Sequence, residues 1–184
     1  MLYDIIIVGG GPAGMMAALT AAQRGHTVDL YEKADRLGGQ LVAAGTPDYK
    51  WPIREYVAYL ERQLQKAGVA VCTGKKVLPD DIRDVDAVIC ALGSVPSRPP
   101  VPGADRPDVW VAEDVFGREQ ELGGNVVVIG GADTGRDVSL YLARSGHHVT
   151  MVTRGQIQLA DDMHTERLQK EAFTTNPNFR SEER

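Results

Sequence analysis

Residues 5–14 read Ile5-Ile6-Ile7-Val8-Gly9-Gly10-Gly11-Pro12-Ala13-Gly14. The four apolar residues predict a strand that is buried on both faces. In the pattern that follows, Gly9 allows a tight turn, Gly11 lets the backbone approach a pyrophosphate, and Gly14 lets a helix pack closely on the strand. Pro12 suits the first turn of that helix, whose N-terminus favours a negatively charged ligand. This stretch therefore predicts a phosphate-binding turn between a strand and a helix.

The residues after this helix extend the prediction to a dinucleotide. Gly25 ends the helix, and 27–31 form a second apolar stretch that predicts a strand. Glu32 follows it, 18 residues beyond Gly14. A carboxylate at this place accepts hydrogen bonds from ribose hydroxyls. A glycine-rich turn without a ligand is the alternative, but the strand, turn, helix, second strand and acid all occur in the expected order.

Two further stretches favour FAD over NAD at this first site. Gly38-Gly39-Gln40-Leu41 follows the acid, and paired glycines let the backbone pass close to a ligand. Residues 87–93 predict a strand that ends in a glycine turn. We expect the first site to bind its cofactor through Gly9, Gly11, Pro12, Ala13, Gly14, Glu32, Lys33, Gly39, Gln40, Ala91 and Gly93.

The chain repeats this unit after 121 residues. Residues 8–14 match 129–135, and 25–28 match 146–149. Each copy is an apolar run, a glycine-rich turn, a helical segment, a glycine and a second apolar run. This order predicts a βαβ unit with parallel strands and a right-handed crossover. The fold class is therefore α/β, a doubly wound parallel Rossmann-like sheet followed by a second, partial Rossmann unit.

The second turn departs from the first in its chemistry. Gly130 and Gly135 keep the outer glycines, but Ala132 replaces the middle one, and its Cβ crowds the pyrophosphate path. Asp133 caps the helix in this interpretation and also repels a phosphate. Thr153 stands where the first copy has its acid, and Arg154 follows. Loss of the acid beside an arginine fits the 2′-phosphate of NADP, with NAD the other candidate, and it fits a site that no longer binds anything equally well.

The composition argues against several classes of protein, and the turn residues indicate the domain boundaries. The net charge of -5 and the absence of a basic cluster argue against a nucleic-acid partner. No apolar run approaches the roughly 20 residues of a membrane span, and the N-terminus shows no signal peptide. Cys72 and Cys90 form no CxxC pair, and we expect two buried thiols in a reducing cytoplasm. We expect a first domain over 1–115, a partial second domain over 116–172 and a frayed tail over 173–184.

Two more elements lie within those domains. Apolar residues at helical spacing predict a helix over 52–67, and Gly68 ends it. A further helix is expected over 161–172, with Asp161 and Asp162 at its N-terminus rather than in a metal site. No metal site and no catalytic side chain is identified.

These motifs resemble the two-dinucleotide-domain flavoproteins, whose FAD strand ends in an Ala-Thr-Gly turn; here Leu92 stands in place of the threonine. Within that superfamily, 38–41 and the proline-rich connector at 96–103 are similar to the C-terminal region of 2,4-dienoyl-CoA reductase and trimethylamine dehydrogenase enzymes. The resemblance implies FAD at the first site and NADH or NADPH at the second. Trimethylamine dehydrogenase relatives carry a similar Ala-Asp-Thr turn and keep an ADP, which argues against nicotinamide binding.

Two hypotheses follow for function. The first is a flavoprotein oxidoreductase module that binds FAD and NAD(P)H and passes electrons to an acceptor. The alternative is a non-catalytic structural module that holds ADP. The resemblance also implies that a complete member continues beyond residue 184 with a Gly-Asp turn on the flavin, so the chain is either a fragment or a reduced form. We therefore expect open apolar surface, and association with itself or with a partner chain.

Overall fold

The computed structural model describes residues 1–98, 100–154, 163–175 and 179–183, which divide into two compact units, Met1–Val95 and Pro96–Arg184. In the first unit the elements are β1 (Asp4–Val8), α1 (Pro12–Gln23), β2 (Thr27–Tyr31), α2 (Gln40–Ala44), α3 (Trp51–Lys66), β3 (Ala70–Cys72) and β4 (Ala87–Cys90). In the second unit they are β5 (Asn125–Ile129), α4 (Asp133–Arg144), β6 (His148–Thr153), α5 (Met163–Thr175) and β7 (Phe179–Glu183).

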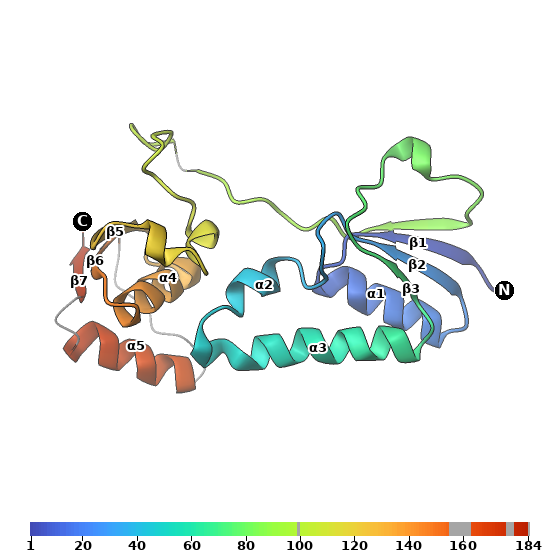
Figure 1. Ribbon diagram of the computed structural model, residues 1–184, viewed down its shortest axis with the longest axis horizontal. Helices are drawn as coiled ribbons and strands as arrows, with labels where there is room; N and C mark the ends of the chain where they lie inside the picture. The colour runs from blue at the N-terminus through green and yellow to red at the C-terminus, as the bar shows by residue number, and fades with distance from the viewer. Residues whose placement is uncertain (99, 155–162, 176–178, 184) are drawn as a thin grey trace. The chain divides into compact units, whose positions relative to one another are not determined.

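The first unit is a parallel sheet with the strand order β3-β2-β1-β4 (Figure 1). Ile5 of β1 lies opposite Val28 of β2 on one side and opposite Ala87 of β4 on the other. Helices α1 and α3 pack against each other and against the sheet. The core holds fully buried residues from all of these layers, Ile7, Met15, Leu30 and Leu60 among them. The register brings the C-terminal ends of β1, β2 and β4 together at the edge where the first glycine turn lies.

The second unit repeats the strand–helix–strand order around a sheet of order β5-β6-β7, also parallel. The predicted α/β fold with parallel Rossmann-like sheets is therefore confirmed. Internal symmetry extends to single hydrogen bonds: the Gly9 amide donates to the Tyr31 carbonyl at 2.8 Å, and the Gly130 amide donates to the Val152 carbonyl at 2.9 Å. The described part of the second sheet has no strand at the position that β4 occupies in the first.

The boundary between the units differs from the predicted one. The division falls at Val95, before the proline-rich connector, rather than at residue 115. Trp110, Val115 and Phe116 explain the difference, because their side chains pack into the core formed by α4, β5 and β6. A hydrogen bond from Tyr141 of α4 to Glu119, 2.5 Å long, fastens the same segment and holds the pKa of the Glu119 carboxyl below its ordinary value.

Three smaller expectations also need correction. Residues 179–183 form β7, which pairs with β6, where the sequence predicted a frayed tail. The parallel pairing provides hydrogen-bond partners for the backbone of this polar segment. Cys72 is half-buried and Cys90 is exposed, because each ends one of the two outer strands of its sheet. The helix predicted over 52–67 is α3, and both of its ends lie one residue earlier than predicted. Asp161 and Asp162 lie outside the described residues.

No helix in the described part of the chain is long and apolar enough to cross a membrane.

Candidate dinucleotide-binding sites

The first turn closes only because its outer glycines lack side chains. Gly9 has a φ of +111°, a left-handed conformation that favours glycine. A Cβ built on Gly14 would overlap the carbonyl oxygen of Gly9, and one built on Gly9 would overlap the carbonyl oxygen of Ala91. The Ala91 amide in turn donates to the Val8 carbonyl at 2.8 Å. Strand β1, helix α1 and the end of β4 therefore meet here through backbone atoms alone.

The middle glycine has a different environment. Gly11 precedes α1 in an extended conformation, φ -73° and ψ 178°, which any residue can adopt. The nearest atom to a Cβ built there is the Gly39 Cα, 4.0 Å away. No side chain caps α1, which begins at Pro12 and continues through Ala13. The fold thus has space for a side chain at Gly11, so folding alone does not require glycine at this position.

Glu32 is the buried acid beside this turn, only 8% exposed. Its Oε2 accepts the Gly10 amide at 2.6 Å, and its Oε1 accepts the Ala34 amide at 2.8 Å. A carboxylate offers about four acceptor directions, so directions remain for ribose hydroxyls. Sequence reasoning missed Gly10, whose Cβ would lie 2.8 Å from the Glu32 Cβ. Its signal was the unbroken run of three glycines.

The second glycine pair packs onto the first turn, a contact that the sequence did not predict. The Gly38 amide donates to the Gly10 carbonyl at 2.8 Å, and Gly38 and Gly39 have φ values of +109° and +53°. A Cβ on Gly39 would lie 3.0 Å from the Gly11 Cα. Predicted residues from three separate stretches, at 9–14, 32 and 39, are therefore brought together.

The Gln40 side chain, at the start of α2, links the first site to the turn after β4. The Gln40 Nε2 donates to the carbonyl oxygen and to the Oγ of Ser94, at 3.1 Å each. Gly93 has a φ of +69° and open space around it, which follows from its place in the turn after β4. Ser94 is a candidate site residue that no pattern in the sequence singled out. Lys33 is exposed beside Glu32, and its contact with a cofactor stays a prediction.

The second turn reproduces the backbone of the first. A Cβ on Gly135 would overlap the carbonyl oxygen of Gly130, which has a φ of +120°. A Cβ on Gly131 would lie 2.7 Å from the Thr153 Oγ1, as Gly10 lies against Glu32 in the first unit. Ala132 keeps the backbone of Gly11, with φ -77° and ψ -178°. Four glycine and alanine positions thus preserve the shape of a nucleotide-binding turn.

The charges at the second turn are different. The prediction that Asp133 caps α4 is wrong: Ala132 is the capping residue, and no side chain caps the helix. The Asp133 carboxylate instead pairs with Arg136, while the Asp133 side chain stays 91% exposed. Arg136 stands where the first unit has the core residue Met15 and is 7% exposed, with its Nε lacking a partner. The exposed Arg154 follows Thr153 at the end of β6.

With both turns in view, the class of protein is defined by a family match over residues 3–183 to the pyridine nucleotide-disulphide oxidoreductases. The chain belongs to this family. This family assignment supports the first hypothesis, a module of an FAD- and NAD(P)-binding oxidoreductase.

Curated relatives agree with this assignment. The chain is 43% identical to an NADH oxidase of Thermoanaerobacter brockii over 80% of this chain and 24% of the relative. It is 40% identical to a cinnamate reductase of Clostridium sporogenes, over 82% of this chain and 23% of that protein. The chain therefore spans about a quarter of the length of these relatives.

Solved structures place the fold in the same group. A 2-naphthoyl-CoA reductase, solved in complex with 2-naphthoyl-CoA, matches all of this chain and 28% of its own, with a TM-score of 0.88 and 28% identity. Thioredoxin reductase of Lactococcus lactis matches 98% of this chain and 64% of its own with a TM-score of 0.70; at 23% identity it supports the fold alone.

The contrast between two glycines of the first turn gives a paired test. Gly11→Ala is expected to fold normally and to lose FAD affinity by tenfold or more, roughly the cost of one unfavourable contact at the phosphates. Gly14→Ala is expected to lower the free energy of unfolding by more than about 3 kcal/mol, because its Cβ has no space. Thermal melting and calorimetric titration with FAD measure the two effects. Unchanged FAD affinity in Gly11→Ala would contradict the assignment of the phosphate site.

The second turn allows a gain-of-binding test. Replacing both Ala132 and Asp133 by glycine removes two Cβ atoms and the Asp133 carboxylate from the entrance to α4. NADPH affinity is expected to rise, because the repulsion of a phosphate disappears. Asp105→Asn, which removes an exposed carboxylate elsewhere in the second unit, serves as the charge control. Calorimetry that finds no change in the double variant would show that the turn is not a nucleotide site.

Proposed function

We propose that this chain carries electrons from NAD(P)H through FAD to an acceptor, as the nucleotide-binding module of a flavin-dependent oxidoreductase. One observation carries the proposal. The turn at 9–14 has free space beside Gly11 and a helix N-terminus without a side-chain cap, and the buried carboxylate of Glu32 lies against it. These features fit a pyrophosphate and a ribose, the parts that FAD shares with other dinucleotides. The paired glycines and the Gln40–Ser94 hydrogen bonds lie where FAD extends beyond its ADP half.

Bound FAD supplies the redox chemistry, since it can accept a hydride from a reduced nicotinamide and release electrons to a further acceptor. The chain's own residues bind and orient the cofactor. The α1 N-terminus would hold the pyrophosphate, Glu32 would accept hydrogen bonds from the ribose hydroxyls, and the backbone at 38–39 and 91–94 would border the remainder. In the described part of the chain we assign no side chain a role in bond making or breaking.

NADP is the preferred occupant of the second turn in this proposal. Arg154 is exposed directly after β6, and Thr153 leaves no carboxylate to repel a 2′-phosphate. The printed names of the relatives include an NADH oxidase and a ferredoxin–NADP reductase, the latter 30% identical over 94% of this chain. Both nicotinamide nucleotides therefore occur among the names of related proteins, and the arginine is what favours NADP here.

Anaerobic mixing of the FAD-loaded chain with NADPH tests the electron transfer. Absorption near about 450 nm, where an oxidised flavin absorbs, is expected to disappear on reduction. Arg154→Met is expected to weaken the response to NADPH while leaving that to NADH unchanged, because only NADPH carries the extra phosphate. A flavin that neither nucleotide bleaches would contradict the proposal and favour a nucleotide-holding module.

That second candidate function has specific support. The Ala132 side chain and the Asp133 carboxylate stand at the second turn, where the first turn has Gly11 and Pro12. A chain that holds ADP or FAD at the first turn and nothing at the second would act as a structural module within a larger flavoenzyme. The nicotinamide titration above separates the two candidates.

We also propose that the chain functions in the cytoplasm and associates with a further polypeptide. The free thiols of Cys72 and Cys90 suit a reducing compartment. Val127 and Ile129 of β5 are 63% and 72% exposed on an outer strand, where a second copy of the chain can cover them. Light scattering is expected to give a mass above that of a monomer, and Ile129→Lys to restore the monomer. A monomeric wild-type chain would contradict self-association.

A further inference from the structure

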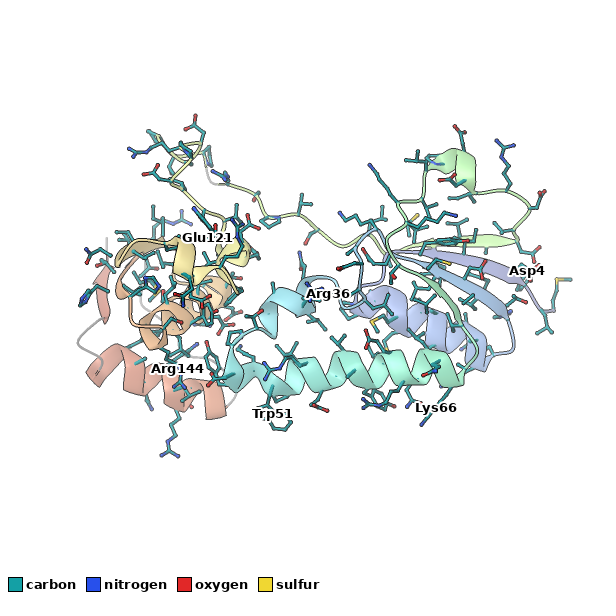
Figure 2. All side chains as sticks on the ribbon, viewed as in Figure 1. Asp4, Arg36, Trp51, Lys66, Glu121 and Arg144 are labelled. Atoms are coloured by element: carbon teal, nitrogen blue, oxygen red, sulfur yellow. The ribbon has the colours of Figure 1, made fainter. Side chains whose placement is uncertain are left out.

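Arg54, near the start of α3, fastens the loop that follows α2. Its Nη1 donates to the carbonyl oxygens of Gly45 and Pro47, at 2.5 and 2.9 Å, and its Nη2 reaches that of Asp48 at 3.5 Å. Gly45 ends α2, so the guanidinium also lies at the negative end of that short helix. Helix α3 runs from Trp51 to Lys66, the two ends that Figure 2 labels. Through the side chain of Arg54 it holds the 45–48 loop.

The segment 38–48 is held at its other end by the first glycine turn. The Gly38 amide bonds the Gly10 carbonyl, and Gly39 lies against Gly11. At this same end, a Cβ built on Gly38 would lie 3.1 Å from the Val57 side chain of α3, so a side chain there would fit only if its neighbours shifted. The segment is therefore a strap that joins the phosphate turn to α3, and Arg54 is its far anchor.

The direction of a bound dinucleotide places this strap beside the flavin half. The pyrophosphate belongs at the α1 N-terminus and the adenosine ribose at Glu32, which follows β2. In the sheet order β3-β2-β1-β4, β4 lies on the opposite side of β1 from β2. The half of FAD beyond the pyrophosphate must therefore extend toward the end of β4. There Gln40 of the strap bonds Ser94.

We propose that Arg54 is a positioning residue for the flavin half of FAD, which it orients through the strap without contacting it. This inference rests on the proposed binding of FAD in the first unit. Loss of Arg54 would loosen the strap and weaken the binding of the flavin half of FAD. The ADP half would keep its contacts with the turn and with Glu32. The affinities for FAD and for ADP should separate.

Titration of the full chain, freed of cofactor, with FAD and with ADP tests this separation. Arg54→Met is expected to lower FAD affinity roughly tenfold, the scale of lost hydrogen bonds from a charged donor, and to change ADP affinity less than about twofold. Arg54→Lys keeps the charge with fewer directed donors and is expected to fall between. Arg62→Met removes an exposed arginine from the same helix and should match the wild type. The visible circular dichroism of bound flavin should change in Arg54→Met and match the wild type in Arg62→Met.

The contrary outcomes are distinct. Equal losses of FAD and ADP affinity would show that Arg54 only supports the fold, and unchanged FAD affinity would show that the strap does not orient the flavin. Either result overturns the inference about Arg54 without contradicting the proposal that the wild-type chain binds FAD. A wild-type chain that binds ADP but not FAD contradicts the proposed function and the inference together. If Arg54→Met does not fold, Arg54→Lys provides the same comparison.

Discussion

The contact between the carbonyl oxygen of Gly9 and the bare Cα of Gly14 is the constraint on which the first unit depends. It lets α1 begin immediately above the end of β1, so that the helix N-terminus, Glu32 and the end of β4 all face one place. The same contact recurs between Gly130 and Gly135 in the second unit. Because no larger residue fits at either position, the sequence pattern is a direct record of backbone geometry.

The two copies show how one backbone supports different electrostatics. In the first unit the turn is neutral, with Pro12 and Met15 where the second unit has Asp133 and Arg136. The added carboxylate and the added guanidinium pair with each other, so the net charge at the second turn is unchanged. Only the Arg136 half of this pair is buried, since the Asp133 side chain is 91% exposed. Removal of Asp133 would leave the buried guanidinium without that partner. The pair therefore affects which anions the turn accepts more than how the turn folds.

Much of this arrangement could be predicted from sequence, because glycine patterns and strand periodicity are local signals. The strands at 5–8 and 27–31 and the helix α3 followed from spacing, and so did the assignment of Gly11 and Gly39 to one site. Contacts that depend on tertiary packing could not be predicted. The bond between Gln40 and Ser94 joins residues 54 positions apart, and the boundary at Val95 depends on where Trp110 and Phe116 pack. β7 was missed because its pairing with β6, rather than its polar composition, makes it a strand.

We predict that the first unit selects FAD through the shape of its glycine turn. We predict that the second unit selects a nicotinamide nucleotide through the charge of Arg154. The measurement that tests its central claim most directly is an absorption spectrum of the purified chain, with mass spectrometry of what it releases on denaturation. Flavin bands near about 370 and 450 nm with one FAD released per chain are the predicted result. A colourless chain that releases ADP, or no nucleotide after incubation with FAD, would contradict it.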